Sequence, residues 1–404
     1  MNLELLTIGT ELLLGYTVDT NGAELARELG AVGVQVVRKT SVPDREEAIR
    51  DAVTEALHRT GAVITTGGLG PTRDDITKRI VAEIFQAPLE FDEAVWQGIV
   101  ERFKRLGRTP ADSNRGQAEV PRGAVVLNNR WGTAPGLWLE GRTGLAILLP
   151  GVPREMRRLL EHEVLPRLRP RSGSRVVRSR TVRTTGIPES RLAEVLGEVE
   201  SRLAPLTLAY LPGVFGVDLR VTAWDLPPEE AAGPLAAAVT LLSELAGKYA
   251  YGEEETDLAE VVLREARERS WQLAVAESCT GGLVGARLTA IPGSSEVFVG
   301  GVIAYDNRVK IRQLGVSDDL LARHGAVSEL VVRAMAEGAA RKFEVEAGLA
   351  VTGIAGPGGG SEEKPVGTIW LGLYLDGRTE AVRQTIPGDR DEVRARAAQA
   401  GLYL

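Results

Sequence analysis

The chain has 404 residues, 44% of them hydrophobic and 25% charged, which is typical of two to four globular domains that each bury a core. Three histidines and one cysteine are scattered along it, which excludes a structural zinc site, a disulfide framework within the chain and an evident Ser-His-Asp arrangement. Any catalysis should therefore use carboxylates, hydroxyls and lysine. The net charge of −7 argues against a general nucleic-acid binder.

The first residues, MNLELLTIGTELLLG, contain Glu4 and Glu11 in place of a basic segment, and no apolar run approaches the length of a membrane span. A single cysteine is typical of a reducing compartment. We therefore expect a cytoplasmic location and no membrane partner.

Strand and helix signals alternate at the beginning of the chain. Strand signals lie at 3–9, 34–42 and 62–68, and helix signals at 21–29, 44–57 and from about 74. The second helix follows Asp44 and Glu47, which are spaced as a capping box. This order predicts an α/β domain over 1–170, with a largely parallel sheet covered by helices.

A different rhythm begins after this domain. The order of signals over 171–250 is strand, helix, two strands around a Pro-Gly turn, and a helix that Gly233 and Pro234 are expected to delay or break. It predicts a small α+β module. Ten arginines and three glutamates lie between Arg154 and Arg183. This stretch is either a solvated linker and edge strand or a face that contacts nucleic acid.

The remaining residues, 251–404, predict a second α/β layered domain. Helix signals lie at 257–269, 281–290, 307–314, 328–342 and from about Asp389, and strand signals at 271–278, 297–305, 348–353, 367–375 and 379–386. The expected architecture is therefore two α/β/α layered domains joined by a small α+β module.

The segment TTGGLGPTRDDITKRI (65–80) is the first candidate site. A buried strand ends in a glycine-rich turn, at Gly67, Gly68 and Gly70, and we expect the next helix to open with Asp74 and Asp75. Two adjacent carboxylates would repel a bare phosphate, so a bridging divalent cation is one reading. The other is that Asp74 caps the helix and Asp75 lies in its first turn. The spacing favours neither.

Two further loops, NNRWGTAPG (128–136) and LLPGVPREM (148–156), are rich in turn-forming residues. They would approach the first site only if the strands before them end at the same edge of the sheet, where open α/β sheets bind ligands.

The segment AESCTGGLVG (276–285) is the second candidate site. Its strand delivers Ser278 to a carboxyl end, close to free backbone N–H groups of the next helix, and either a nucleophile or a helix cap fits there. Cys279 could be the nucleophile instead, but no histidine lies near it in the sequence, and it is more typical of a small buried hydrophobic residue.

Lys310 strengthens the catalytic reading of this second site. It follows a strand in a chain with only seven lysines, and a lysine made neutral by burial can act as general base to a serine. An exposed helix lysine is the alternative. The loop VTGIAGPGGG (351–360) suits a phosphate, to which Arg390 and Arg394 could add charge-assisted contacts.

Several of these segments together resemble the CinA family of competence/damage-inducible proteins. IGTELLLGYTVDTN, TTGGLGPTRDD, GTAPG and PGVPREM resemble its N-terminal half, which is similar to the molybdopterin-binding fold. AESCTGG, YDNRVK, VTGIAGPGG and GDRDEVR resemble its C-terminal half, a nicotinamide mononucleotide (NMN) deamidase domain. Family members carry a KH-like module between the halves, which fits the small α+β module predicted over 171–250.

For residues 251–404 the resemblance implies hydrolysis of NMN to nicotinate mononucleotide and ammonia, without a cofactor. Ser278 would attack the amide carbon, Lys310 would take its proton, and Tyr305 and Thr352 would position the amide and the base. The residues implied in oxyanion, ribose and phosphate contacts are Thr280, Gly281, Gly282, Gly353, Gly356, Gly358, Arg390 and Arg394.

For residues 1–170 the resemblance implies metal-dependent cleavage of ADP-ribose to AMP and ribose 5-phosphate. Asp74 and Asp75 would hold the divalent cation, and Gly67, Gly68 and Gly70 would surround the diphosphate. The pocket would also include Glu11, Asn129 and Glu155.

The implied partners are these nucleotides and a second copy of the chain in a homodimer, with no nucleic acid. Two other readings stay open: a non-catalytic ligand binder that assists competence or recombination proteins, and a nucleic-acid-binding module built on the arginine-rich stretch.

Overall fold

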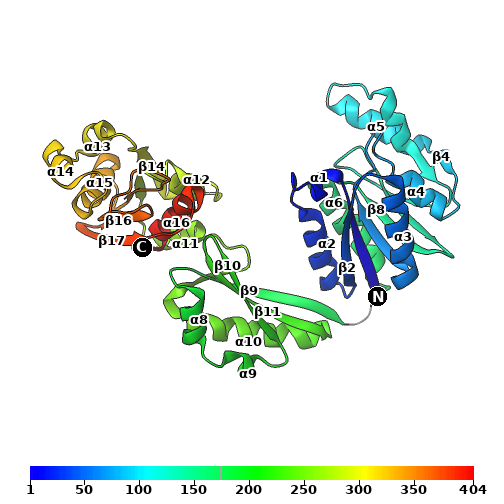
Figure 1. Ribbon diagram of the computed structural model, residues 1–404, viewed down its shortest axis with the longest axis horizontal. Helices are drawn as coiled ribbons and strands as arrows, with labels where there is room; N and C mark the ends of the chain where they lie inside the picture. The colour runs from blue at the N-terminus through cyan, green and yellow to red at the C-terminus, as the bar shows by residue number, and fades with distance from the viewer. Residues whose placement is uncertain (173–174) are drawn as a thin grey trace. The chain divides into compact units, whose positions relative to one another are not determined.

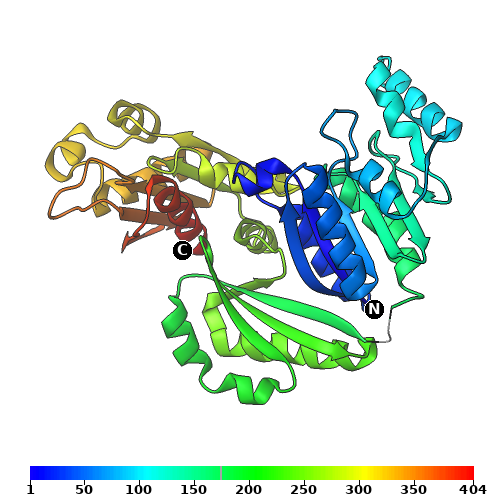
Figure 2. The ribbon, with the colours of Figure 1, turned by 45° about the vertical axis from the view of Figure 1, so that its right-hand side comes forward.

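The computed structural model describes residues 1–172 and 175–404. These residues form two compact units, the first made of Met1–Arg178 with Ala223–Gly233 and the second of Ser179–Thr222 with Pro234–Leu404. Figures 1 and 2 show the order of the elements along the chain. No helix of the described residues is both long and apolar enough to cross a membrane.

The first unit contains a six-stranded sheet in the order β2-β1-β3-β8-β7-β6. Strands β2, β1, β3 and β8 are mutually parallel, whereas β7 runs antiparallel to both of its neighbours. Strands β4 and β5 form a separate antiparallel pair. The strands are β1 (Asn2–Ile8), β2 (Gln35–Val42), β3 (Ala62–Thr66), β4 (Leu89–Phe91), β5 (Glu119–Pro121), β6 (Val125–Leu127), β7 (Gly136–Gly141) and β8 (Gly144–Leu149).

Helices cover both faces of this sheet because its central strands bury both of their side-chain rows. Leu3 and Leu5 of β1 pack with α2, α6 and the turns after α6, whereas Leu6 and Ile8 pack with α3 and α4 (Figure 1). The helices are α1 (Thr10–Leu13), α2 (Thr20–Ala31), α3 (Glu46–Thr60), α4 (Thr77–Ile84), α5 (Glu93–Arg105), η1 (Asp112–Ala118), α6 (Pro153–Leu159), η2 (Leu160–Val164) and α7 (Leu165–Leu168).

Two predicted helix starts in this unit are wrong. Asp44 does not cap α3, because its carboxylate accepts hydrogen bonds from the backbone N–H (2.8 Å) and hydroxyl (3.1 Å) of Thr10. Asp74 and Asp75 do not open α4, which begins at Thr77. Asp75 instead accepts hydrogen bonds from the N–H and hydroxyl of Thr72, and this local turn delays the helix.

The middle of the chain forms a four-stranded sheet in the order β10-β11-β9-β12, with the helices lying along one face (Figure 2). The predicted Pro-Gly turn is wrong, since Pro212 and Gly213 end β10 and the chain reverses after them. The elements are β9 (Val176–Thr184), α8 (Glu189–Leu196), α9 (Val199–Leu203), β10 (Thr207–Gly213), β11 (Gly216–Leu226), α10 (Pro228–Ala246), η3 (Gly247–Tyr249) and β12 (Ala250–Glu253).

The predicted break in the last helix of this module is also wrong. Helix α10 runs without interruption through Gly233 and Pro234. A proline crowds the Cβ of the residue before it, and Gly233 has no Cβ, so this steric cost of a proline inside a helix is absent at Pro234.

The arginine-rich stretch is largely neutralised by ion pairs within each unit. Seven of its ten arginines lie within ion-pair distance of a carboxylate, in the pairs Arg157–Glu24, Arg158–Glu161, Arg167–Glu163, Arg171–Glu140, Arg175–Asp225, Arg180–Glu253 and Arg183–Asp218. Arg180 also pairs with Glu254 at 2.6 Å. These contacts leave little uncompensated positive charge for a phosphate backbone.

The C-terminal part of the second unit has a five-stranded sheet in the order β14-β13-β15-β16-β17, in which β14, β13 and β15 are parallel and β16 and β17 antiparallel. The elements are α11 (Leu258–Glu268), β13 (Leu273–Glu277), α12 (Leu283–Thr289), η4 (Ser294–Glu296), β14 (Phe298–Ile303), α13 (Asn307–Leu314), α14 (Asp318–His324), α15 (Glu329–Phe343), β15 (Ala347–Gly353), β16 (Thr368–Leu375), β17 (Arg378–Thr385) and α16 (Arg390–Tyr403).

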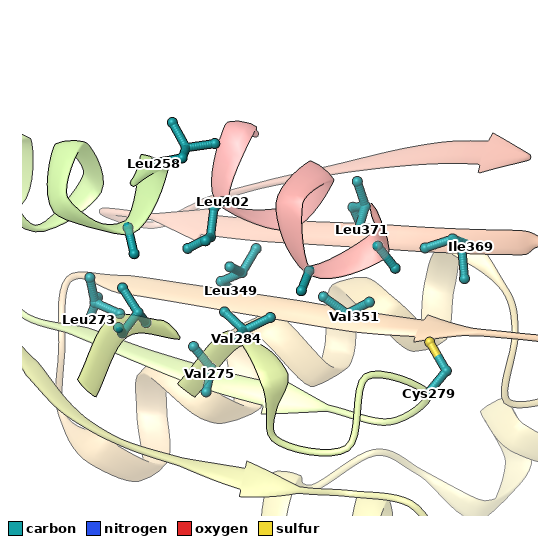
Figure 3. Close-up of a cluster of buried hydrophobic side chains, with 14 of the residues drawn as sticks. Leu258, Leu273, Val275, Cys279, Val284, Leu349, Val351, Ile369, Leu371 and Leu402 are labelled. Atoms are coloured by element: carbon teal, nitrogen blue, oxygen red, sulfur yellow. The ribbon is translucent and has the colours of Figure 1, made fainter. Parts of the chain in front are cut away.

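This sheet also buries both faces. Leu273 and Val275 of β13 pack with α11, α12 and α16, and Figure 3 shows part of that cluster. Ala274 and Ala276 pack with α13, α14 and α15 on the other face. The fold class is therefore confirmed as mixed α/β, with two layered domains and a small module between them in the sequence.

Candidate active sites

Ser278 and Lys310 lie together at the carboxyl end of β13. Ser278 follows this strand directly, and Lys310 lies at the end of the first turn of α13. The Lys310 Nζ lies 3.3 Å from the Ser278 Oγ, and the exposed fractions of the two residues are 1% and 8%. The structure thus brings together two residues that are 32 positions apart in the sequence.

The Lys310 amine is held by two main-chain carbonyls besides the serine. Nζ donates to Ala304 O at 2.7 Å and to Tyr305 O at 3.2 Å. Burial lowers the pKa of Lys310 below its usual range, and Asp306 opposes this shift only in part. A lysine in these surroundings is a candidate general base.

A cavity of about 290 Å³ opens onto this pair. Thr352 lines it from the end of β15, and its hydroxyl donates to Ala326 O at 2.9 Å. Tyr305 is largely exposed, and its hydroxyl accepts a hydrogen bond from Arg390 at 3.2 Å. The cavity is lined by Ser278, Cys279, Tyr305, Lys310, Ala326, Val327, Thr352, Gly353, Ile354, Ala355, Gly356, Gly358, Gly359 and Arg390.

The other implied contact residues lie outside this lining. Arg394 donates to the carbonyls of Cys279 (3.3 Å) and Thr280 (3.2 Å), so it contacts the turn that follows Ser278. Gly281 and Gly282 belong to the same turn and have φ of +63° and +100°, a region that favours glycine.

Sequence reasoning missed Glu277, the residue before the serine. Its exposed fraction is 2%, and its carboxylate accepts hydrogen bonds from the N–H groups of Gly282 (2.9 Å), Val284 (3.1 Å) and Gly285 (2.8 Å). The expectation that the start of α12 offers free N–H groups is therefore wrong. The N–H groups of Cys279 and Thr280, which follow Ser278, are not among those that Glu277 binds.

Cys279 is buried in the hydrophobic cluster, as the sequence suggested (Figure 3). Burial raises the pKa of its thiol to about 12. The thiolate is the reactive form, so this cysteine is poorly suited to be the nucleophile.

In the first unit, the three candidate loops lie at one edge of the sheet. Strands β3 and β8 are parallel neighbours, and Gly67 N donates to Leu149 O at 3.0 Å just beyond their ends. Gly67 has φ of +110°, and a Cβ there would lie 2.1 Å from Ile8 O. Gly68 has φ of +68°, and a Cβ there would lie 2.0 Å from the hydroxyl oxygen of Thr77. Close packing of the chain therefore requires both glycines.

Asp74 and Asp75 lie on the loop between β3 and α4. A Cβ on Gly70 would lie 2.4 Å from a carboxylate oxygen of Asp75, so Gly70 leaves room for that side chain. Interaction with the Thr72 side chain lowers the pKa of Asp74. Among residues 1–172 and 175–404, no group of three or more His, Cys, Asp or Glu side chains could hold a metal ion.

Asn129 and Glu155 join the other two loops. The Asn129 amide donates to Glu155 at 2.6 Å and to Ala134 O at 2.8 Å, and its oxygen accepts the N–H of Gly132 at 2.8 Å. Burial raises the pKa of Glu155. Asn129 lines a cavity of about 480 Å³ whose walls include Arg102, a residue that sequence reasoning missed.

Glu11 lines a second and smaller cavity, of about 110 Å³. Asn21, another missed residue, lies in its wall and donates to the Thr66 hydroxyl (3.0 Å) and to Gly151 O (2.8 Å). Asp74 and Asp75 are outside both cavities. The structure therefore does not place the two aspartates in one pocket with Glu11 or with Asn129.

The fold and these sites define a chain that joins a molybdopterin-binding type of α/β domain to a KH-like module and a second α/β domain. Family models match accordingly: "Probable molybdopterin binding domain" at residues 4–170, "Damage-inducible protein CinA KH domain" at 179–252 and "CinA C-terminal domain" at 255–404.

Full-length relatives give the same result. A CinA-like protein of Gemmatimonas aurantiaca is 54% identical over 100% of this chain and 95% of its own length, and one of Dictyoglomus turgidum is 42% identical over 100% and 98%. The chain belongs to the CinA family. The crystal structure titled as the protein CinA with unknown function from Thermoplasma acidophilum is 36% identical and covers 40% of this chain and 94% of its own, with a TM-score of 0.37.

Proposed function

We propose that the C-terminal part of the second unit hydrolyses the carboxamide of NMN to nicotinate mononucleotide and ammonia. The observation that carries this proposal is the buried contact between Lys310 Nζ and Ser278 Oγ, 3.3 Å long, at the wall of a cavity. Hydrolysis of an amide needs a nucleophile, a base that can later protonate the leaving nitrogen, and donors for the oxyanion.

The hydrogen bonds around Lys310 suit proton transfer. A neutral amine has two N–H donors and one lone pair, and the carbonyls of Ala304 and Tyr305 accept the two donors. The lone pair then accepts the Ser278 proton as Oγ bonds to the amide carbon. The resulting ammonium gives a proton to the amide nitrogen, the carbon–nitrogen bond breaks, and ammonia leaves an acyl-serine ester. Water, deprotonated by the amine, hydrolyses this ester and restores Ser278.

Other groups at and beside the cavity would orient the substrate. The N–H groups of Cys279 and Thr280, in the turn after Ser278, would bind the oxyanion, and Thr352 and Tyr305 would contact the amide from the adjoining strand ends. Arg390 and the glycine-rich loop that includes Gly356 would hold the phosphate.

The direct test incubates the purified full-length protein with NMN and measures ammonia and nicotinate mononucleotide. Ser278→Ala should release ammonia at least about 10³-fold more slowly than the wild type. Equal rates for the two proteins would refute the serine mechanism. Release of no ammonia by the wild type would favour the alternative of a non-catalytic accessory protein in competence.

We propose a second activity for the first unit, cleavage of ADP-ribose to AMP and ribose 5-phosphate. The observation in its favour is that the loops at 67–75, 128–135 and 150–155 all lie at the carboxyl edge of one sheet. Ligands of open α/β sheets bind at this edge.

In this proposal Asp74 and Asp75 would supply two carboxylate ligands to a divalent cation near the turn at Gly67 and Gly68, and substrate oxygens would complete its coordination, as is common for Mg²⁺. The cation would neutralise charge on the diphosphate. A chelator should abolish ADP-ribose cleavage and leave ammonia release from NMN unchanged. Cleavage that persists in excess chelator would refute the cation assignment.

We also propose that the chain acts on nucleotides as a homodimer in the cytoplasm and does not bind nucleic acid. The internal pairing of the arginine-rich stretch supports the last point. Light scattering of the purified protein measures the oligomeric state. Titration with single-stranded RNA at two salt concentrations tests the nucleic-acid alternative.

A further inference from the structure

Glu277 is a buried carboxylate next to the proposed nucleophile. It contacts the turn that follows Ser278 and the segment that holds Lys310. Its side chain accepts three N–H groups at the start of α12, so it fixes both ends of the turn from Ser278 to Gly282. The turn is tied from the outside as well, because Arg394 donates to the carbonyls of Cys279 and Thr280.

The main chain of Glu277 reaches the lysine side. Its carbonyl accepts the N–H of Ala304 at 2.7 Å, and the carbonyl of Ala304 accepts the Lys310 Nζ at 2.7 Å. One residue is therefore linked through its side chain to the turn that carries Ser278, and through its backbone to the segment that holds Lys310.

We propose that Glu277 is a positioning residue that sets the distance between Ser278 and Lys310, an inference that rests on the proposed serine–lysine mechanism. Glu277 does not line the cavity, so it has no direct part in holding the substrate. A loosened turn would move Ser278 Oγ away from the amine and leave the other walls in place. Misplacement of reacting groups by about 1 Å can cost about 100-fold in rate.

The variants are Glu277→Gln, which keeps the size but turns one oxygen into a donor facing backbone N–H groups, and Glu277→Asp, which is shorter by one carbon. The matched control is Glu346→Gln. Glu346 accepts the N–H of Gln272 at 2.9 Å just before the opposite end of β13, far along the strand from Ser278. Circular dichroism and thermal unfolding establish which proteins fold.

Two rates are measured on the full chain. The first is ammonia release from NMN, resolved into kcat and KM. The second is covalent labelling of Ser278 by a small fluorophosphonate, in which the serine oxygen bonds to phosphorus, fluoride leaves and the proton passes to Lys310. This second reaction needs the serine–lysine pair but not the nucleotide cavity, so it separates positioning from substrate binding.

In folded Glu277→Gln, kcat and the labelling rate should each fall about 100-fold, with KM and the midpoint of the pH–rate profile unchanged within error. Glu277→Asp should lie between this variant and the wild type, and Glu346→Gln should stay within about twofold of it.

Three results would overturn the inference: a folded Glu277→Gln with kcat and labelling within about threefold of wild type, a rise in KM at constant kcat, or loss of the fold in both variants. The last would show that Glu277 supports the whole unit and not the pair in particular. Wild-type protein that is labelled at Ser278 but releases no ammonia refutes the proposed substrate only, and the labelling rates then decide the role of Glu277. If the wild type shows neither reaction, both proposals fail.

Discussion

Replacement of Lys310 by arginine separates a general base from a cation that only binds. At pH 7.5 about one in 10³ ordinary lysines is neutral, and each pKa unit that burial removes raises this fraction tenfold. The neutral fraction of an arginine is below about one in 10⁵, and a guanidinium has no lone pair to accept the Ser278 proton. The mechanism therefore predicts that Lys310→Arg lowers kcat by about 10³-fold or more.

The surroundings of Lys310 also bear on the stability of this variant. Only 1% of the residue is exposed, and the amine has three acceptors within 3.3 Å. A larger guanidinium that stays charged is costly there. Lys310→Met, of similar length and without charge, is therefore made in parallel and is expected to be equally inactive. Lys342→Arg, on an exposed position of α15, is the matched control and should keep its rate.

The assay is ammonia release over a range of NMN concentrations at each pH, which gives kcat and kcat/KM separately. In the wild type, kcat/KM should rise with pH until Lys310 is neutral and then level off, at a pH below the usual pKa of lysine because burial lowers it. A folded Lys310→Arg with more than about a tenth of the wild-type kcat would refute the role of Lys310 as base. So would a wild-type profile that levels off only above about pH 10.

Three further predictions concern stability and reactivity. Between the lowered pKa of Lys310 and its ordinary value, the unfolded chain binds more protons than the folded one. The free energy of unfolding, measured in denaturant titrations, should therefore rise with pH in this window and fall as pH drops. The variant Lys310→Met should lose this pH dependence. In calorimetry, Gly67→Ala should destabilise the first unit by about 3 kcal/mol or more, because the added Cβ would meet Ile8 O. Gly98→Ala is the control on α5, where the added Cβ meets no other atom, and it should stabilise the unit by about 0.5–1 kcal/mol. Iodoacetamide should alkylate Cys279 in folded protein at least about 10³-fold more slowly than in urea, since burial raises the thiol pKa to about 12; fast alkylation would contradict that burial.

The parts of the fold that follow from local periodicity could be predicted from the sequence. The apolar runs of β1, β3, β13 and β15 and the spacing in α3 and α15 each follow one strong pattern, so their positions agree with the structure to within a few residues. Helix α14 was missed because its seven residues contain only a short apolar pair, Leu320 and Leu321.

The errors arose where a local pattern competes with a contact from a distant part of the chain. Asp44 has the spacing of a helix cap, but Thr10, 34 residues away, takes its carboxylate. Glu277 lies inside a buried strand run, where a charged residue gives no periodic signal, and only the folded turn shows what it binds.

The pairing of β12 with β9 decides where the chain can be divided for study. Residues 250–253 belong to the sheet of the middle module, where Ala250 pairs with Thr184 and Glu253 with Val182. A fragment that begins at 251 would therefore carry a strand without its neighbour, and a fragment that ends at 249 would leave β9 with an open edge. Unpaired edges promote self-association. Division of the chain between residues 253 and 254 avoids both, and aggregation of a C-terminal fragment that still carries residues 251–253 would then reflect this one strand and not the chemistry of Ser278.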